Sequence, residues 1–400
     1  MKERAGLVVL AMFLLFGGVL VYLRTSRPGG AHDHDHDQDH PARPDAAAAA
    51  ATTITLLYSS EKEEWLREAV ASWQSAHPDV RVELEAQGSI DSVRSLMANE
   101  KRPTLWAPAD SLAENLFATQ WQIAHGEDPL VRDGTRWPRS LLLTPLVFVI
   151  WESRARVLLG QEQNLRWQRL RDAVALRAGW QGLGGDPAWA FVKFGHTDPQ
   201  RSNSGLQALV LMAYGFYDRQ QGLTVQDVTA QPFQDFLRAL ESGRQRQDFG
   251  ATSTGTFMQN MLRQGPSLYD VAVVYEALAI TSIPRAAGRW EALRVYYPNI
   301  NLWNDHPLCL FRTDWVTPAQ RRAAEALADH LMSAPVQHAA LRRGFRPGNL
   351  DVPMLTNEPD NPFNRFRDMG IATSLPRVAQ APDGAVLQAL LQTWQRNQGN

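Results

Sequence analysis

The segment TLLYSSEKEEWLREAVASWQSAHP, residues 55–78, joins an apolar strand to an amphipathic helix through a pair of serines. Trp65, Ala69, Val70 and Trp73 recur at helical spacing, and Pro78 ends the pattern. A strand that passes directly into a helix is typical of α/β proteins, in which helices cover a mostly parallel sheet.

The same alternation continues along the chain. VRVELEA (80–86) predicts a strand, and residues 88–100 and 111–121 predict helices. A second block begins near Pro145 with PLVFVIW (145–151), whose lack of polar alternation predicts a strand buried on both faces. Further helices are expected over 205–217, 233–242 and 254–265, and a buried strand over 269–275. Thr317 and Pro318 have the residue types that start a helix, and two helices are expected over 317–344.

An uncharged apolar run occupies residues 6–23, which is long enough for a helix to cross a bilayer. Lys2 and Arg4 precede the run, and Arg24 and Arg27 follow it. We predict an uncleaved, single-pass membrane anchor in residues 1–30, with the main domain on the extracytoplasmic, periplasmic side of the cell membrane. A buried core helix is the alternative.

Residues 31–52 form a linker rich in His, Asp and Ala that lacks apolar periodicity. His32, His34, His36 and His40 alternate with carboxylates, and both groups are ligands for zinc, copper or nickel. A flexible tract holds a metal weakly, because ordering it costs backbone entropy. A solvated spacer is therefore the preferred interpretation, and no cofactor is expected.

Composition narrows the function. The net charge of −2 gives no support for a nucleic-acid partner. Cys309 is the only cysteine, so no intrachain disulfide is expected. The chain has no HExxH, GxSxG or phosphate-loop motif, so we do not expect an enzyme. The roughly 350 residues after the linker exceed the usual limit of one hydrophobic core, which predicts two lobes.

Four segments carry a resemblance to a known family: TLLYSSEKEEWL (55–66), TPLVFVIWES (144–153), FGHTDPQRSNSGLQALVLMAYGF (194–216) and YDVAVVYEALAI (269–280). In their order and spacing they resemble the type II periplasmic binding proteins, especially their molybdate- and sulfate-binding branch. SNSG (202–205) and WAPAD (106–110) also resemble solute-binding domains associated with von Willebrand A modules. The resemblance implies two α/β lobes, with residues 53–145 in lobe 1, 146–296 in lobe 2, and 297–400 returning to lobe 1 and ending in C-terminal helices. It also implies a hinge of crossing strands, a ligand in the cleft, and a permease or von Willebrand A partner.

Ligands of such sheets bind beyond the carboxyl ends of the strands, where helix starts offer N–H groups and serines offer hydroxyls to an anion. Gly205 would allow close backbone approach, and STG (253–255) offers one more helix start. By position or by the resemblance, the candidate ligand-binding residues are Ser59, Ser60, Ser89, Ser204, Gly205 and Tyr275. The alternative is that the serines are only helix N-caps.

Four further residues bear on the charge of the ligand. Arg201 and Asn203 adjoin the serines of SNSG, and Arg201 would favour an anion. Asp110 and Glu276 would repel an anion. If Glu276 enters the cleft, the ligand is a cation, a zwitterion or a sugar; if it points away from Tyr275, as strand neighbours do, it belongs to the lobe surface.

The expected function is that of an extracytoplasmic solute-binding protein, which captures a small polar ligand for an ABC-type transporter, with oxyanions among the candidates. The alternative is a non-transport accessory or sensor domain of a membrane-associated complex.

Overall fold

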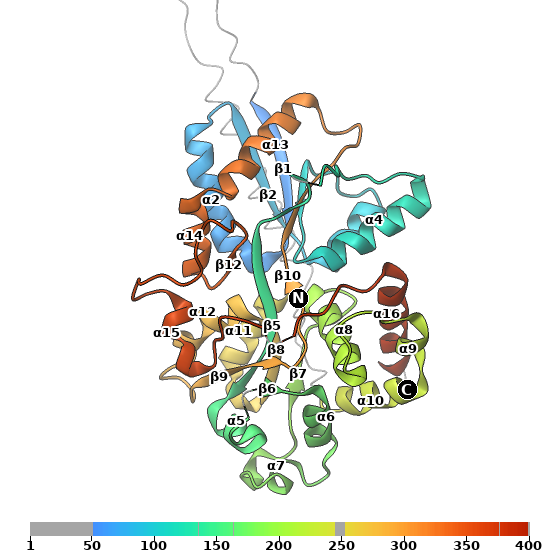
Figure 1. The fold of residues 1–400 in the computed structure, drawn as a ribbon, viewed down its shortest axis with the longest axis vertical. Helices are drawn as coiled ribbons and strands as arrows, with labels where there is room; N and C mark the ends of the chain where they lie inside the picture. Colours follow the sequence, from blue (N-terminus) through green and yellow to red (C-terminus); the bar gives the residue numbers. More distant parts are fainter. Residues whose placement is uncertain (1–50, 135, 163, 245–252, 376, 399–400) are drawn as a thin grey trace, which may run out of the picture. The chain divides into compact units, whose positions relative to one another are not determined.

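The computed structural model describes residues 51–134, 136–162, 164–244, 253–375 and 377–398 (Figure 1). The predicted anchor in residues 1–30 and the histidine tract lie outside the described residues. Within these ranges, no helix has the length and apolar character needed to cross a bilayer. The same ranges hold no group of three or more His, Cys, Asp or Glu residues placed to bind a metal ion.

Lobe 1 is built on a sheet with the strand order β2-β1-β3-β11-β4. Its strands are β1 (Thr52–Tyr58), β2 (Val80–Ala86), β3 (Leu105–Ala107), β4 (Arg139–Ser140) and β11 (Pro307–Leu310). β1 is parallel to β2 and β3, and β11 is antiparallel to β3 and β4. The helices of this lobe are α2 (Glu63–Ala76), α3 (Ser89–Met97), α4 (Ser111–His125), α13 (Pro318–Leu331) and α14 (Ala334–Arg342).

Lobe 2 is built on a second sheet, in which β6-β9-β5-β8-β7 lie side by side. The strands are β5 (Leu142–Trp151), β6 (Asn164–Leu165), β7 (Phe194–Gly195), β8 (Val271–Tyr275) and β9 (Leu293–Pro298). Nine of the ten residues of β5 are buried, as its unbroken apolar pattern predicts. The helices here are α5 (Glu152–Leu159), α6 (Trp167–Ala175), α7 (Gly179–Gly182), α8 (Asn203–Tyr217), α9 (Val225–Thr229), α10 (Gln231–Glu241), α11 (Thr254–Gln264) and α12 (Glu276–Ala286).

Crossing strands connect the two lobes. The chain leaves lobe 1 at β4 and enters the second sheet as β5, and it returns through β10 (Trp303–Asn304) into β11. The first residues of β5 also pair with β10 and with β12 (Arg346–Pro347). The first predicted lobe boundary, at residue 145, falls inside β5, because β5 continues without a break from the crossing into the second sheet. The second predicted boundary, at residue 296, falls inside β9 of the same sheet.

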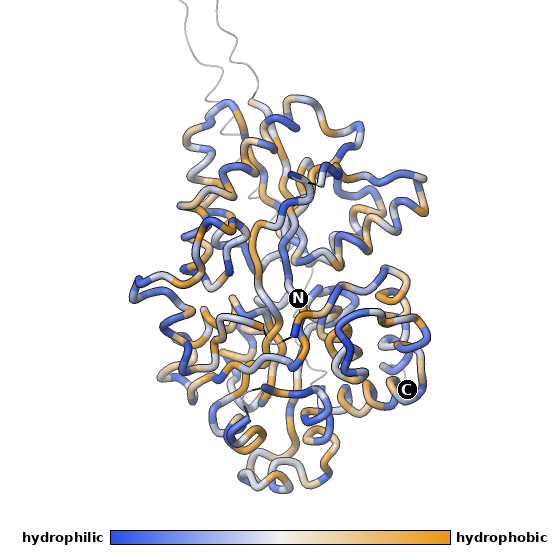
Figure 2. Tube along the Cα trace, viewed as in Figure 1, coloured by the Kyte–Doolittle hydropathy of each residue, from blue (hydrophilic) through white to orange (hydrophobic). Residues whose placement is uncertain are grey.

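The C-terminal segment contacts both lobes. After α15 (Pro362–Arg365), the chain ends in α16 (Gly384–Gln398), which packs against α4 of lobe 1 and against α8, α9 and α10 of lobe 2 (Figure 1). Leu387, Leu390 and Trp394 share one apolar cluster with Phe117 of α4 and Val210 of α8. Many of the turns at the outside of the two lobes consist mainly of hydrophilic residues (Figure 2). The segment assigned from the sequence to lobe 1 thus ends in a helix that both lobes share.

Two local predictions can be compared directly with the fold. The Thr317 N-cap is confirmed: its hydroxyl accepts from the Gln320 N–H at 3.2 Å, and the Gln320 side chain accepts from the Thr317 N–H at 2.9 Å. The helix expected after Ser60 begins as a 3₁₀ turn over Ser60–Lys62, and α2 starts at Glu63. The tighter turn accompanies the burial of the Lys62 side chain.

Candidate functional site

Chain segments from both lobes meet around a small polar cavity, here called the inner cavity. Its volume is about 10 Å³, close to the least that holds one water molecule. The segments that line it follow β1, β2 and β3, precede α8 and α11, or end β8. The lining residues are Ser59, Ser60, Glu61, Gly88, Ser89, Ala109, Ser202, Asn203, Ser253, Thr254 and Tyr275.

Three helices, α3, α8 and α11, begin at the wall of this cavity. Gly88, the N-cap of α3, has no side chain, and Ser202, the N-cap of α8, makes no side-chain capping hydrogen bond. At α11, the hydroxyl of Ser253 accepts from the Thr256 N–H at 3.3 Å. Helix N-termini carry partial positive charge and unsatisfied N–H groups, so they attract a ligand oxygen.

A buried ion pair lies behind the β1 side of the cavity. Lys62 is fully buried, and its ammonium donates to the Ala107 carbonyl at 3.0 Å, to the Pro108 carbonyl at 3.2 Å and to the Ser59 hydroxyl. The Ser59 hydroxyl in turn donates to Glu61 Oε1 at 2.5 Å. Serine and ammonium therefore hold the Glu61 carboxylate at the cavity wall.

Glu61 carries a negative charge into the site. Its Oε1 lies 3.3 Å from Lys62 Nζ and 3.3 Å from Nδ1 of His306, which is fully buried between β10 and β11. Burial acts to raise the pKa of Glu61, but the Lys62 ammonium and the contacts with His306 and Ser59 bring that pKa well below its ordinary value. A carboxylate at the wall disfavours a free anion and suits a ligand that donates hydrogen bonds.

Asp110 and Asn203 connect the two lobes beside the cavity. Asp110 Oδ1 caps α4 by accepting from the N–H groups of Leu112 and Ala113, at 3.0 and 3.3 Å. Asp110 Oδ2 accepts from Asn203 Nδ2 at 2.8 Å. Burial, reinforced by the Asp305 charge, raises the pKa of Asp110 to about 7.

Several polar atoms remain available to a ligand. Asn203 Oδ1 is buried and has no hydrogen-bond partner among the described residues, although Asn203 Nδ2 also lies 3.3 Å from the Tyr275 hydroxyl. The Ser89 hydroxyl accepts from the Ala109 N–H at 2.9 Å, which leaves its own O–H free to donate. The cavity thus offers an amide acceptor and a hydroxyl donor from opposite lobes.

Ser204 and Gly205 lie close to the cavity but do not line it. The Ser204 hydroxyl is 2.7 Å from the Thr197 hydroxyl and 2.7 Å from the Thr254 hydroxyl, so it positions Thr254. A Cβ at Gly205 would lie 2.4 Å from the Thr197 carbonyl oxygen. The close backbone approach that the sequence suggests at Gly205 is therefore made by the preceding loop of the chain.

Glu276 and Arg201 lie outside the cavity. Glu276 is fully buried in lobe 2, where Arg346 donates to its two oxygens at 2.8 and 2.7 Å and Tyr297 also donates to it. Of the two placements that the sequence left open, the carboxylate is thus turned toward Arg346 and does not line the inner cavity. Arg201 is half exposed, and its Nε is 3.6 Å from Asp91 Oδ2 of α3, so it joins the lobes at the rim.

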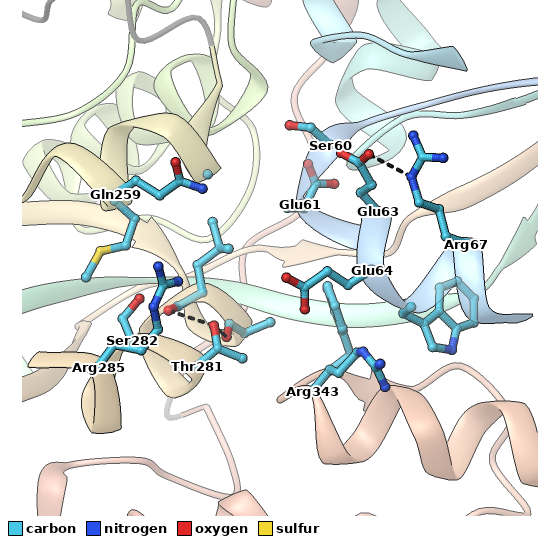
Figure 3. Close-up of a pocket in the computed structure, with 16 residues that line it drawn as sticks. Ser60, Glu61, Glu63, Glu64, Arg67, Gln259, Thr281, Ser282, Arg285 and Arg343 are labelled. Atoms are coloured by element: carbon cyan, nitrogen blue, oxygen red, sulfur yellow. Dashed lines mark hydrogen bonds and ion pairs between the residues drawn. The ribbon is translucent and has the colours of Figure 1, made fainter. Parts of the chain in front are cut away.

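A larger pocket, here called the outer pocket, adjoins the inner cavity and shares Ser60 and Glu61 with it. Its volume is about 710 Å³, and it lies between the 3₁₀ turn Ser60–Lys62 and α2 of lobe 1 and α11 and α12 of lobe 2 (Figure 3). Its other polar and charged lining residues are Glu63, Glu64, Arg67, Gln259, Thr281, Ser282, Arg285 and Arg343.

Residues 54–346 match a family model described as bacterial extracellular solute-binding protein. The chain belongs to this family. Solute-binding proteins of this kind serve transport and are not enzymes. Their family places this solute-binding protein on the extracytoplasmic side of the membrane. No curated protein sequence that was compared matches the chain.

Solved structures share the fold of this solute-binding protein. The sulfate-binding protein SubI from Mycobacterium tuberculosis H37Rv has 17% identity and a TM-score of 0.53, covering 84% of this chain and 96% of its own. Maltose-bound MalE3 from T. maritima has 12% identity and a TM-score of 0.58, with coverages of 87% and 93%. A solute-binding protein from Thermotoga lettingae TMO bound with α-D-tagatose has 13% identity and a TM-score of 0.57, with coverages of 87% and 94%. The two-lobed type II periplasmic-binding-protein fold is thereby confirmed. These proteins are described with sulfate, maltose and tagatose, and this variety identifies no ligand for the present chain.

The site of this solute-binding protein contains two charged residues, Glu61 and Lys62, that the sequence analysis did not select. Charged side chains in the first turn of a helix are usually exposed to solvent, so the sequence did not indicate that Glu61 and Lys62 are buried. Their position directly after the Ser59–Ser60 pair, at the carboxyl end of β1, was the available signal. Nothing in the sequence indicated that His306 would lie beside Glu61, because the two residues are far apart in the chain.

Proposed function

We propose that this solute-binding protein captures a small polar solute between its two lobes and delivers it to the permease of an ABC-type transporter. The main support is the convergence of polar groups from both lobes on one cavity, beside the hydrogen bond from Asn203 of α8 to Asp110 of lobe 1. A ligand that touches both lobes stabilises the closed form by its differential affinity for that form.

The proposed contacts divide into two groups. Ser60, Ser89, Asn203, Thr254 and Tyr275 line the cavity and are proposed to contact the solute. Ser59, which also lines the cavity, and Ser204 are proposed to position Glu61 and Thr254 through their hydroxyls. Because Glu61 is ionised, the solute is proposed to present a donor to Glu61 and Asn203 Oδ1, and an oxygen to the starts of α3 and α8.

Binding is tested by calorimetry on a panel of sulfate, molybdate, sugars, amino acids and polyamines. A hit should stabilise the protein by about 2.7 kcal/mol at a hundredfold excess over Kd. Asn203→Ala should weaken the hit by about 1–3 kcal/mol, because a buried ligand group loses its partner. Asp360→Ala, at an exposed carboxyl far from the cavity in sequence, is the matched control. Full affinity of both Asn203→Ala and Ser60→Ala would place the ligand elsewhere.

The membrane anchor in residues 1–30 remains part of the proposal. Replacing these residues with a cleavable signal should release a folded domain into the soluble extracytoplasmic fraction. Recovery of the truncated protein in the membrane fraction would reject the anchor.

A second candidate function is a non-transport accessory or sensor domain of a membrane complex, including one with a von Willebrand A partner. It is favoured by the apolar cluster that α16 shares with both lobes, since a continuous core resists hinge opening. Small-angle scattering distinguishes the two functions: a transport receptor contracts when its ligand is added, whereas an accessory domain keeps the same radius of gyration.

A further inference from the structure

The size of the two spaces indicates where most of the solute lies. Pockets for small molecules usually measure about 300–1,000 Å³. The inner cavity, at about 10 Å³, holds one small group, whereas the outer pocket offers about 710 Å³. Because Ser60 and Glu61 belong to both linings, one molecule can enter the outer pocket and direct a polar group past them into the inner cavity.

Most charges around the outer pocket already have partners. Arg67 Nε lies 2.8 Å from Glu63 Oε1, and Glu61 faces Lys62. Arg343 pairs with Glu68, the residue after Arg67 on α2. Because the charges within each pair largely cancel, these residues contribute little net electrostatic potential to the outer pocket.

Glu64 and Arg285 are different. Both line the outer pocket, Glu64 from α2 of lobe 1 and Arg285 from α12 of lobe 2, and neither makes an ion pair in the described part of the chain. Figure 3 shows Glu64 reaching from α2 toward α12, with Arg285 on the facing wall. The pocket therefore presents one uncompensated negative charge and one uncompensated positive charge from opposite lobes.

The rest of the lining suits an amphipathic body between these charges. Trp65, Met258, Leu278 and Phe345 supply apolar surface, and Gln259 supplies an amide that makes no hydrogen bond within the described residues. A purely anionic or purely cationic solute would match one charge and be repelled by the other, whereas a zwitterion matches both.

We propose that the solute is a zwitterion of amino-acid-like size, whose cationic end faces Glu64 and whose anionic end faces Arg285. This inference rests on the proposed solute-binding function and names its substrate class. Such a solute contacts α2 of lobe 1 and α12 of lobe 2 at the same time, so its binding stabilises the closed arrangement of the lobes.

The test is calorimetry on the full chain at low salt. L-glutamine is the zwitterionic probe, glutamine amide carries only the cation, and N-acetylglutamine carries only the anion. For L-glutamine, Glu64→Gln and Arg285→Gln should each raise Kd about fivefold, the upper range for partly exposed charge pairs. Glutamine amide should lose affinity only in Glu64→Gln, and N-acetylglutamine only in Arg285→Gln, because loss of the like charge relieves repulsion and does not weaken either probe.

Arg343→Gln is the matched control, because it removes a pocket charge that Glu68 already neutralises; it should change Kd less than twofold. If sulfate or maltose binds with Asn203→Ala sensitivity while both pocket variants leave Kd unchanged, the zwitterion is wrong and the solute-binding function stands. If no panel member binds, the proposed function fails with it. If Glu64→Gln and Arg285→Gln lower the ligand-free melting temperature non-additively, the two charges pair with each other and the inference is overturned.

Discussion

Asp110 is buried in lobe 1 beside Asn203 of lobe 2, and its titration links pH to stability. Burial, together with Asp305, raises its pKa from the ordinary 3.8 to about 7. Between these two values, the folded state binds the proton more tightly than the unfolded state does. The contribution of Asp110 to the free energy of unfolding is therefore largest at low pH and is lost as the pH rises toward 7.

Asp110→Asn should flatten this dependence. The amide cannot titrate, still caps α4, and can pair with Asn203 Oδ1 if that amide flips. Urea denaturation at pH 4.5, 5.5, 6.5 and 7.5 should show a smaller fall in the free energy of unfolding for Asp110→Asn than for the wild type. Asp360→Asn, at an exposed carboxyl, should keep the wild-type slope. Equal slopes for Asp110→Asn and the wild type would contradict the raised pKa.

For individual residues, the sequence predicted the positions of the polar candidate residues better than it predicted their side-chain partners. Ser60, Ser89, Asn203 and Tyr275 reach one cavity because strand ends and helix starts meet at one edge of each sheet. The partner of Glu276 could not be predicted, because Arg346 lies 70 residues further along the chain and meets it only through the fold.

Among the helices, α8 shows how backbone packing places the candidate site. Its first turn lies against the loop at residues 197–199, and only a residue without a Cβ fits at Gly205. The helix itself was predicted from residues 205–217, and its observed start at Asn203 brings two more candidate residues, Asn203 and Ser204, into the first turn. Element boundaries depend on such contacts, which the local pattern does not contain.

Gly205→Ala should destabilise the protein by about 1–3 kcal/mol or more, because the added carbon meets backbone atoms that cannot move aside easily. Gly255→Ala is the matched control in the first turn of α11, where the nearest atom to the added carbon lies 3.9 Å away. That control should be neutral or stabilise by up to about 1 kcal/mol. Guanidinium denaturation measures both, and similar losses for the two variants would show that the clash at Gly205 is relieved.

Considered whole, the domain has two sheets that the sequence indicated and a shared C-terminal helix that it did not. Strand–helix alternation and chain length were sufficient to predict the two lobes. The position of α16 could not be predicted in this way, because it packs on apolar faces of α4 and α8 that are distant in sequence. The matched family region ends at residue 346, so this helix follows the part that the family model covers.

A disulfide between α4 and α16 tests whether α16 moves with lobe 2. A Cβ at Gly384 would lie 3.6 Å from the Cβ of Thr119, within the range of a disulfide, and Cys309 is buried and does not compete. We expect oxidised Thr119→Cys/Gly384→Cys to bind ligand more slowly, by roughly an order of magnitude, because opening requires the lobes to separate. Reduction should restore the rate, as measured by stopped-flow fluorescence. Identical rates in both redox states would assign α16 to lobe 1.

The central strand β5 has a further consequence, for amide hydrogen exchange. Residues Phe148 to Ile150 pair with β8 on one side and with β9 on the other, whereas the residues at the start of β5 pair with short strands near the crossing. Opening the doubly paired stretch to solvent requires the second sheet to come apart, so its amide protons exchange only through near-global unfolding. The amides near the crossing exchange through smaller fluctuations. We therefore expect one continuous strand to hold both the slowest-exchanging centre of the protein and the hinge of the proposed lobe motion.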